Sequence, residues 1–189
     1  RVISEAGFDL IDGHIRKSSS QPKAEKTIDV DRHLTAIIRH DLSAPFKVLI
    51  KNGLLKRELS VFDYGCGRGD DLRELEAHGV KALGWDPNFA PEAKLVESDI
   101  VNIGFVINVI EDPIERIEAL QRAHALSRKF TVVSAMIAGE TTISRFEPFG
   151  DGVLTSRNTF QKYYGQTELQ HFIEKSLDAE AIAAAPGIF

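Results

Sequence analysis

The chain has 189 residues, enough for one domain with a substantial core, and its 43% hydrophobic and 27% charged content is typical of a globular protein. Its net charge of −5 argues against a broad nucleic-acid-binding surface, and any contact with a polyanion would favour the N-terminal part, where positive charges prevail. The single cysteine, Cys66, excludes an internal disulfide, a metal site built from several cysteines and an iron–sulfur cluster, and it favours a cytoplasmic protein. We find no apolar run long enough to span a membrane and expect no signal peptide.

Composition divides the chain into two parts. Residues 1–28 have no clear pattern, and the charged, serine-rich stretch 16–23 indicates a solvated linker. Residues 29–189 are predicted to form the main domain. The chain starts at Arg1 rather than Met and stops on the apolar stretch 187–189, so we expect a fragment of a longer protein.

The main domain is expected to begin with a helical extension over residues 29–55. Asp31 can cap a first helix over 32–40, because an Asp side chain accepts hydrogen bonds from the free N–H groups of a helix start. A second helix is predicted over 42–50, with a proline in its first turn and Gly53 as its stop. We expect both helices to pack beside the main sheet.

Residues 60–71 predict a buried strand that ends in a glycine-rich turn and runs into a helix over 72–79. A strand, a Gly-x-Gly-x-Gly turn and a helix are the arrangement by which α/β proteins bind nucleotide-like cofactors. Glycines lack the side chains that would keep a ligand away from the backbone. The candidate cofactor-binding residues in this stretch are Asp63, Tyr64, Gly65, Cys66, Gly67 and Gly69.

The spacing of this turn excludes two common phosphate-binding motifs. The dinucleotide fingerprint has one more residue before its third glycine, and the phosphate loop ends in Gly-Lys-Ser/Thr, which is absent here. Asp63 lies two residues before the first glycine, where its carboxylate could meet a cationic or amine-bearing ligand. A tight turn that binds nothing is the alternative.

A second strand is predicted over 81–86, and it ends in Asp86 about 20 residues after the turn. A carboxylate at this position can accept hydrogen bonds from both hydroxyls of a ribose. The alternative is an Asp-Pro turn at a strand end. The combination with the glycine turn favours the ribose role.

Beyond this strand the pattern alternates between strands and helices, as expected for a mostly parallel α/β sheet with helices on both faces. We predict an apolar strand over 100–110, a helix with periodic apolar residues over 114–123 and another strand over 130–137. A long polar loop over 139–165, a helix over 168–175 capped by Thr167 and an incomplete last strand over 187–189 follow.

Several motifs together resemble those of the DNA phosphorothioation-associated methyltransferase family, over about residues 29–189. They are Asp-Arg-His-x-Thr-Ala-Ile at 31–37, Val-Phe-Asp-Tyr-Gly-Cys-Gly-Arg-Gly-Asp-Asp at 61–71, Gly-Trp-Asp-Pro at 84–87, Asn-Val-Ile-Glu-Asp-Pro at 108–113 and Thr-Phe-Gln-Lys at 159–162. The glycine turn also resembles motif I of class I S-adenosylmethionine (SAM) methyltransferases, in which the preceding acid faces the amino-acid part of the cofactor. The resemblance implies a Rossmann-like class I methyltransferase domain that binds SAM and is encoded near DNA sulfur-modification genes.

The resemblance also implies a third strand at one edge of the sheet, for which the chain has little room. In the methyltransferase sheet this strand lies ~14 Å from the fourth, and a parallel crossover over that distance needs roughly a dozen residues. We therefore expect a rudimentary or missing third strand around residues 94–97. Two roles are then open to Asp99: it contacts the adenine of the cofactor as a third-strand acid, or it opens the fourth strand.

The sequence after the predicted fourth strand holds the candidates for catalysis. DNA amino-methylating enzymes place Asp/Asn-Pro-Pro-aromatic there, whereas this chain has Asn108-Val-Ile-Glu111, which is closer to enzymes that act on small molecules, RNA or proteins. Cytosine ring-carbon methylation needs a nucleophilic cysteine, and Cys66 lies inside the glycine turn. Asn108 and Glu111 are therefore our candidates beside the transferred methyl, and an acid favoured at a helix start is the alternative for Glu111. His33 and His40 are candidate bases or surface residues.

The polar loop at 139–165 is a candidate wall or lid of the acceptor site, because long polar loops often have this role. We expect Thr159, Gln161 and Tyr164 to face inward, with Gln161 as a catalytic residue, and an ordinary surface loop is the alternative. Two functions remain: a methyltransferase that acts on an unidentified polar acceptor, and a non-catalytic domain that senses SAM or another nucleotide. The sequence leaves the acceptor and the oligomeric state open.

Overall fold

The computed structural model describes residues 8–11, 14–17, 30–36 and 38–189. Most of the predicted linker, together with residues 29 and 37 of the predicted helical extension, lies outside this described part. Within the N-terminal segment, β1 (Phe8–Ile11) and β2 (His14–Lys17) pair as an antiparallel hairpin. No helix in the described ranges is long and apolar enough to cross a membrane.

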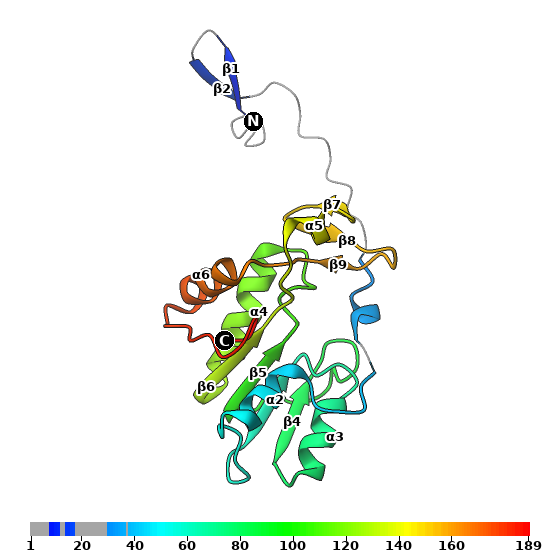
Figure 1. Cartoon of the computed structure of the whole chain (residues 1–189), viewed down its shortest axis with the longest axis vertical. Coiled ribbons are helices and arrows are strands. Elements are labelled where there is room, and N and C mark those ends of the chain that lie inside the picture. The colour runs from blue at the N-terminus through cyan, green and yellow to red at the C-terminus, as the bar shows by residue number, and fades with distance from the viewer. Residues whose placement is uncertain (1–7, 12–13, 18–29, 37) are drawn as a thin grey trace.

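The main domain is built on a parallel sheet of four strands in the order β4-β3-β5-β6 (Figure 1). The strands are β3 (Val61–Tyr64), β4 (Ala82–Trp85), β5 (Ser98–Gly104) and β6 (Ser127–Ser134). This arrangement confirms the predicted α/β fold class. The apolar run predicted as a strand over 100–110 leaves the sheet after Gly104, because Phe105 takes a left-handed conformation with φ 59°.

Helices cover both faces of the sheet, as predicted. On one face, α2 (Ala44–Lys51) and α3 (Asp70–Ala77) pack on side chains such as Val61 and Ile100. On the other face, α4 (Pro113–Ala125) and α6 (Gln166–Leu177) pack on side chains such as Phe62 and Val101. Adjacent residues of a strand point to opposite faces, so each strand contributes to both halves of the core.

The predicted helical extension is wrong in its first half. In place of a helix over 32–40, the chain forms a short 3₁₀ turn, η1 (Arg32–Thr35), and Asp31 does not cap it. Beyond this turn the backbone N–H groups of Arg39 and Ser43 donate to the carboxylates of Asp70 and Asp71 rather than to helical carbonyls. These long-range hydrogen bonds take the place of the backbone hydrogen bonds of a helix. The second predicted helix is present as α2, and Gly53 follows it with φ 66°.

The predicted absence of a full third strand is confirmed. The chain passes from the end of β4 to the start of β5 through residues 86–97, which form turns and a single bridge between Asp86 and Ala90. In the described part of the chain, β4 therefore has a neighbour on one side and is an edge strand.

The region predicted as one long polar loop, 139–165, contains more structure than expected. A short helix, α5 (Glu140–Ile143), leads into an antiparallel sheet of β7 (Glu147–Phe149), β8 (Gly152–Leu154) and β9 (Phe160–Gln161). The strands are too short and irregular for the sequence pattern to reveal them. Figure 1 places this small sheet beyond the carboxyl ends of β5 and β6, the side on which the lid was predicted.

The last two predicted elements are present with small changes. The helix α6 starts at Gln166, and its first turn is closed by a hydrogen bond of 3.0 Å from the Gly165 N–H to Glu168, so Thr167 does not cap it. The final residues lie antiparallel to β6, because Val133 and Phe189 exchange two backbone hydrogen bonds of 2.9 Å.

Candidate functional site

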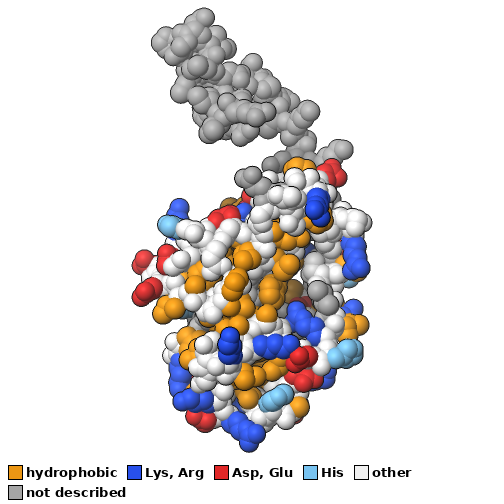
Figure 2. Space-filling model, viewed as in Figure 1, with side chains coloured by type: hydrophobic (Ala, Val, Ile, Leu, Met, Phe, Trp, Pro, Cys, Tyr) orange, Lys and Arg blue, Asp and Glu red, His pale blue; other side chains and the backbone are white. Residues whose placement is uncertain are grey.

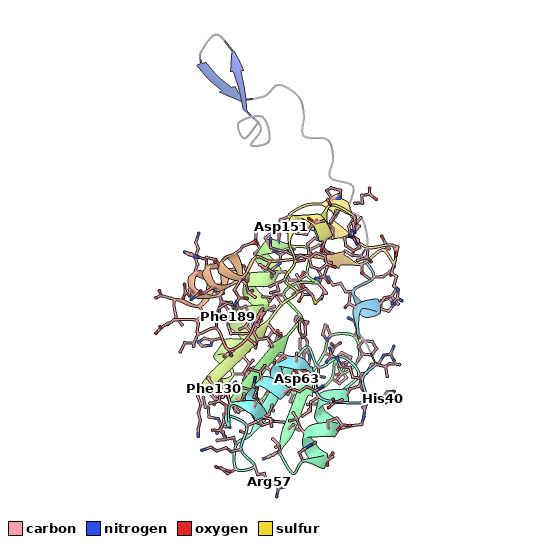
Figure 3. All side chains as sticks on the ribbon, in the orientation of Figure 1. His40, Arg57, Asp63, Phe130, Asp151 and Phe189 are labelled. Carbon is pink, nitrogen blue, oxygen red and sulfur yellow. The ribbon has the colours of Figure 1, made fainter. Side chains whose placement is uncertain are left out.

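A cavity of about 270 Å³ lies at the carboxyl ends of β3, β4 and β5. Its walls come from the glycine turn, the end of β4, the loop after β5, the segment 32–43 and one side of α4. Open parallel sheets bind ligands at this edge, where strand ends and helix starts meet. Asp63, at the carboxyl end of β3, lies near the middle of the domain (Figure 3).

The glycine turn brings its backbone close to this cavity. Gly65, Gly67 and Gly69 have φ values of 84°, 53° and 73°, a region in which side chains are strained. A Cβ atom on Gly65 would lie 2.4 Å from Cγ2 of Val106, so the turn and the loop after β5 pack too closely for any side chain there. The turn is therefore both left-handed and tightly packed.

Asp63 is buried directly below the turn and accepts a hydrogen bond of 2.7 Å from Nδ2 of Asn102. Burial raises the pKa of this carboxyl group to about 7, and the negative charge of Asp71 adds to the effect, while the bond from Asn102 opposes it. The buried Oδ1 of Asn102 has no hydrogen-bond partner among the described residues. The site thus holds a carboxylate and an amide oxygen that a positively charged donor would stabilise.

Asp86 ties the end of β4 to the glycine turn. Its Oδ2 accepts from the Gly67 N–H at 3.0 Å, and its Oδ1 accepts from the N–H groups of Asn88 and Phe89 at 2.8 and 3.0 Å. A carboxylate has about four acceptor positions, so one remains for a ligand hydroxyl. This single remaining position is fewer than the two expected for a ribose.

The segment 32–43 is held over the cavity by the first turn of α3. The Arg39 N–H donates to Asp70 at 2.8 Å, and the Arg39 guanidinium and the Ser43 N–H donate to Asp71 at 3.1 and 2.6 Å. Both carboxylates are buried. Acids at a helix start are favoured by the helix dipole, and here they also fix the position of a cavity wall.

A second ion-pair cluster closes the other end of this wall. The Arg32 guanidinium binds both carboxylate oxygens of Glu111 at 2.8 and 2.9 Å and both of Glu115 at 2.6 and 2.7 Å. The hydrogen bond to Glu115, with further help from Glu111, raises the pKa of Arg32, although its partial burial opposes this. Arg32 therefore joins the N-terminal segment to the start of α4.

A family model described as a methyltransferase domain matches residues 32–141, more than half of the chain. The chain belongs to the methyltransferase domain family. The match spans the segment that closes the cavity, the glycine turn, β4, β5, α4 and β6, so the cavity lies wholly within it. No curated protein sequence matches the chain.

Solved structures share the fold of this methyltransferase domain at low sequence identity. A SAM-dependent methyltransferase from Methanosarcina mazei is 14% identical, with a TM-score of 0.53 over 72% of this chain and 84% of the other. The 1,6-didemethyltoxoflavin-N1-methyltransferase of Burkholderia thailandensis, solved with 1,6-didemethyltoxoflavin and S-adenosylhomocysteine, is 17% identical, with a TM-score of 0.50 over 78% and 68%. This likeness concerns the fold.

The methyltransferase cavity brings together most of the residues that the sequence predicted for the cofactor. Asp63, Tyr64, Gly65, Cys66, Gly67 and Asp86 line it, whereas Gly69 lies just outside and immediately precedes α3. Burial raises the pKa of the Cys66 thiol to about 12, which makes it a poor nucleophile, as expected for a cysteine inside the turn.

Asp99 does not lie at this cavity. It stands near the start of β5, at the opposite end of the sheet, and accepts two hydrogen bonds from Ser60, at 3.0 Å from its N–H and 2.9 Å from its hydroxyl. Of its two predicted roles, opening the fourth strand fits this position and contact with adenine does not.

The predicted catalytic residues do not line the cavity. Asn108 is buried, and its backbone carbonyl accepts from the Lys162 N–H at 2.7 Å. Glu111 is bound by Arg32, and the Gln161 side chain donates to the backbone carbonyl of Lys162. The other two loop residues that were expected to face the acceptor site, Thr159 and Tyr164, point into the protein core and not into the cavity. Thr159 is buried and bonded to Thr155, and Tyr164 is buried against α6.

Both candidate histidine bases are exposed, and Figure 3 shows His40 at the outer edge of the domain. Neither lines the cavity, which fits their alternative interpretation as surface residues.

Sequence reasoning missed several cavity residues, among them Arg39, Trp85, Asn102 and Phe105. Asn102 is a polar residue inside an apolar strand, and this break in the pattern is a signal that could have pointed to a buried partner such as Asp63. Arg39 has no comparable signal, because it lies in a polar stretch where a charged residue breaks no pattern.

Proposed function

We propose that the chain is a SAM-dependent methyltransferase that acts on a polar acceptor. The observation that supports this best is the buried Asp63 carboxylate, which lies beneath three left-handed glycines and beside an unpaired amide oxygen of Asn102 within the described structure. The α-amino group of SAM is positively charged and offers N–H donors to both oxygens. A ligand with an amine next to a nucleoside therefore fits the site.

The residues around the cavity fit SAM in three further ways. The backbone at Gly67, which lines the cavity without a side chain, accommodates the amino-acid part. Asp86 has one acceptor position for a ribose hydroxyl, and Tyr64 and Trp85 offer apolar surface. When bound, SAM supplies a methyl group on a sulfonium, which is transferred by in-line displacement. The chain orients the two reactants, and positioning of this kind lowers the barrier by several kcal/mol, up to about 10.

Proton removal from the acceptor is the step with the least support from the cavity. Both oxygens of Glu111 and of Glu115 are engaged by Arg32, so neither carboxylate is free to take a proton in this arrangement. An acceptor with a free lone pair at neutral pH needs no base. We therefore favour an acceptor of this kind, such as an unprotonated ring nitrogen.

The same ion pairs support a second candidate function, a non-catalytic domain that senses SAM or another nucleotide. In such a domain Arg32 would report occupancy of the cavity through its bonds to α4 rather than assist turnover. Measurable methyl transfer to any acceptor separates the two functions.

We further propose a connection with a DNA phosphorothioation system, which rests on the sequence resemblance. DNA itself is not favoured as the acceptor. On the face shown in Figure 2, basic side chains are interspersed with acidic and hydrophobic ones, and the net charge is −5.

Thermal shift and calorimetry with SAM, S-adenosylhomocysteine and NAD test the proposal. We expect stabilisation by the first two and none by NAD. Screens of metabolites and nucleic acids with radiolabelled SAM then test transfer. Stabilisation by NAD alone would overturn the proposed cofactor.

A further inference from the structure

The missing third strand leaves one part of the cofactor cavity without its expected wall. Residues 86–97 form turns, and Asp99 lies at the other end of the sheet. The described part of the chain therefore brings no third-strand acid to the position at which the resemblance implies contact with adenine.

One side of α4 takes the place of this wall. Glu115, Glu118, Ala119 and Arg122 line the cavity, and residues three and four apart lie on the same face of a helix. Trp85 and the two residues after Asp86 line the same cavity from the end of β4. The Trp85 ring stands 5.1 Å from the ring of Tyr64, so this compartment combines flat aromatic surface with charged groups.

The charged groups of this compartment match the edge of an adenine. Adenine presents an amino group that donates next to a ring nitrogen that accepts. Glu118 supplies an acceptor and Arg122 a donor, and the two side chains are already close, with Nη2 of Arg122 3.0 Å from Oε2 of Glu118. Glu115 is less suited, because Arg32 engages both of its oxygens.

We propose that the adenine of the cofactor lies between Trp85 and α4, with its amino group bonded to Glu118 and its N7, which is an acceptor in hypoxanthine as well, bonded to Arg122. This inference rests on the proposed function, since it names how the same cavity selects its base. Helix α4 then takes the role of the missing strand, and the domain discriminates adenine from hypoxanthine.

Glu118 and Arg122 lie at the surface, so each can be replaced without loss of the fold. The side chains of Glu118 and Arg122 are 51% and 67% exposed, and exposed ion pairs contribute little to stability. Replacing either residue should therefore change ligand selection while leaving the thermal midpoint almost unchanged.

The test uses the fluorescence of Trp85, the single tryptophan of the chain. The protein is titrated with S-adenosylhomocysteine and with its hypoxanthine analogue, in which a carbonyl oxygen replaces the amino group. We expect the wild type to prefer the adenine compound roughly tenfold, because the analogue sets an oxygen against the Glu118 carboxylate. Its emission should change as the base enters the compartment.

Three variants complete the experiment. Glu118→Ala should reduce the preference to near unity, and Glu118→Gln should also narrow it, because an amide can donate to the carbonyl of hypoxanthine. Glu76→Gln, on an exposed position of α3 outside the cavity, is the matched control and should keep the full preference.

The inference would be overturned, and the proposed function left standing, by either of two results. One is a full preference for the adenine compound in Glu118→Ala, and the other is Trp85 fluorescence that does not change when the ligand binds. Failure of the wild type to bind S-adenosylhomocysteine by calorimetry would overturn the proposed function and this inference together.

Discussion

At the scale of single residues, a glycine of the turn both allows a left-handed backbone and leaves space for a ligand. Gly67 has φ 53°, lines the cavity and donates its N–H to Asp86. In Gly67→Val, a branched side chain would enter the space next to the ligand, so we expect affinity for S-adenosylhomocysteine to fall by more than about a hundredfold, equivalent to about 2.7 kcal/mol. Calorimetry on the folded variant measures this.

The control for this substitution separates backbone strain from ligand access. Gly53 has φ 66° and lies outside the cavity, and a Cβ atom added there would meet no other atom within 4 Å. Gly53→Val therefore carries a similar strain, of order 1–3 kcal/mol, without blocking the site. Equal losses of affinity in both variants would show that strain, and not the cavity, explains the effect.

The Asp63 carboxyl group makes stability depend on pH. Its pKa is raised by burial from 3.8 to about 7, so between about pH 4 and pH 7 the folded protein keeps a proton that the unfolded chain has released. The free energy of unfolding should fall as pH rises through this window, with a slope of at most about 1.4 kcal/mol per pH unit, and level off above it.

Asp63→Asn should remove this fall while keeping the acceptor for Asn102, so the variant gains stability relative to the wild type from pH 5 to pH 8. Urea unfolding at several pH values measures the difference. Asp99→Asn is the control, because hydrogen bonds from Ser60 lower the pKa of Asp99 and move its titration below the window. Parallel curves for wild type and Asp63→Asn would contradict the prediction.

At the scale of elements, a buried arginine joins α4 to the small β7–β9 sheet. The Arg116 side chain is 2% exposed and donates to Asp151 at 2.7 and 3.1 Å and to the carbonyl of Ile110 at 2.8 and 3.2 Å. Breaking a buried pair costs about 3–5 kcal/mol, and the 40% exposure of Asp151 reduces this.

We expect Arg116→Met to destabilise the domain by about 2 kcal/mol, because the carbonyl of Ile110 loses its donor in a buried site. Chemical denaturation measures the change. Arg122→Met, on the exposed side of the same helix, is the matched control and should cost less than about 0.5 kcal/mol. A similar loss of unfolding free energy in both variants would show that the burial of Arg116 does not contribute to stability.

These elements also show which parts of the site a sequence can reveal. The turn at Gly65–Gly69 and the acids Asp63 and Asp86 were predictable, because strand, turn and helix are local patterns with fixed spacing. The missing third strand followed from chain length. The hydrogen bonds of Arg39 to α3 and the approach of α4 to the cavity depend on tertiary contacts between distant segments, and no local pattern indicates them.

At the scale of the whole molecule, the cavity joins segments that are distant in sequence. The segment 32–43 closes it from one side, the glycine turn and the end of β4 form its floor, and α4 stands opposite. A ligand that touches all of these walls should stabilise the domain as a unit, by about 2.7 kcal/mol at a concentration one hundred times its dissociation constant.

Hydrogen exchange with and without S-adenosylhomocysteine locates this stabilisation. We expect added protection in residues 38–43, 65–69 and 104–110, because these backbones surround the cavity. In Asp71→Ala the Ser43 N–H and the Arg39 guanidinium lose their acceptor, so protection of 38–43 should fall while that of 65–69 persists. Protection confined to the glycine turn in the wild type would mean that the N-terminal segment is not a wall of the occupied site.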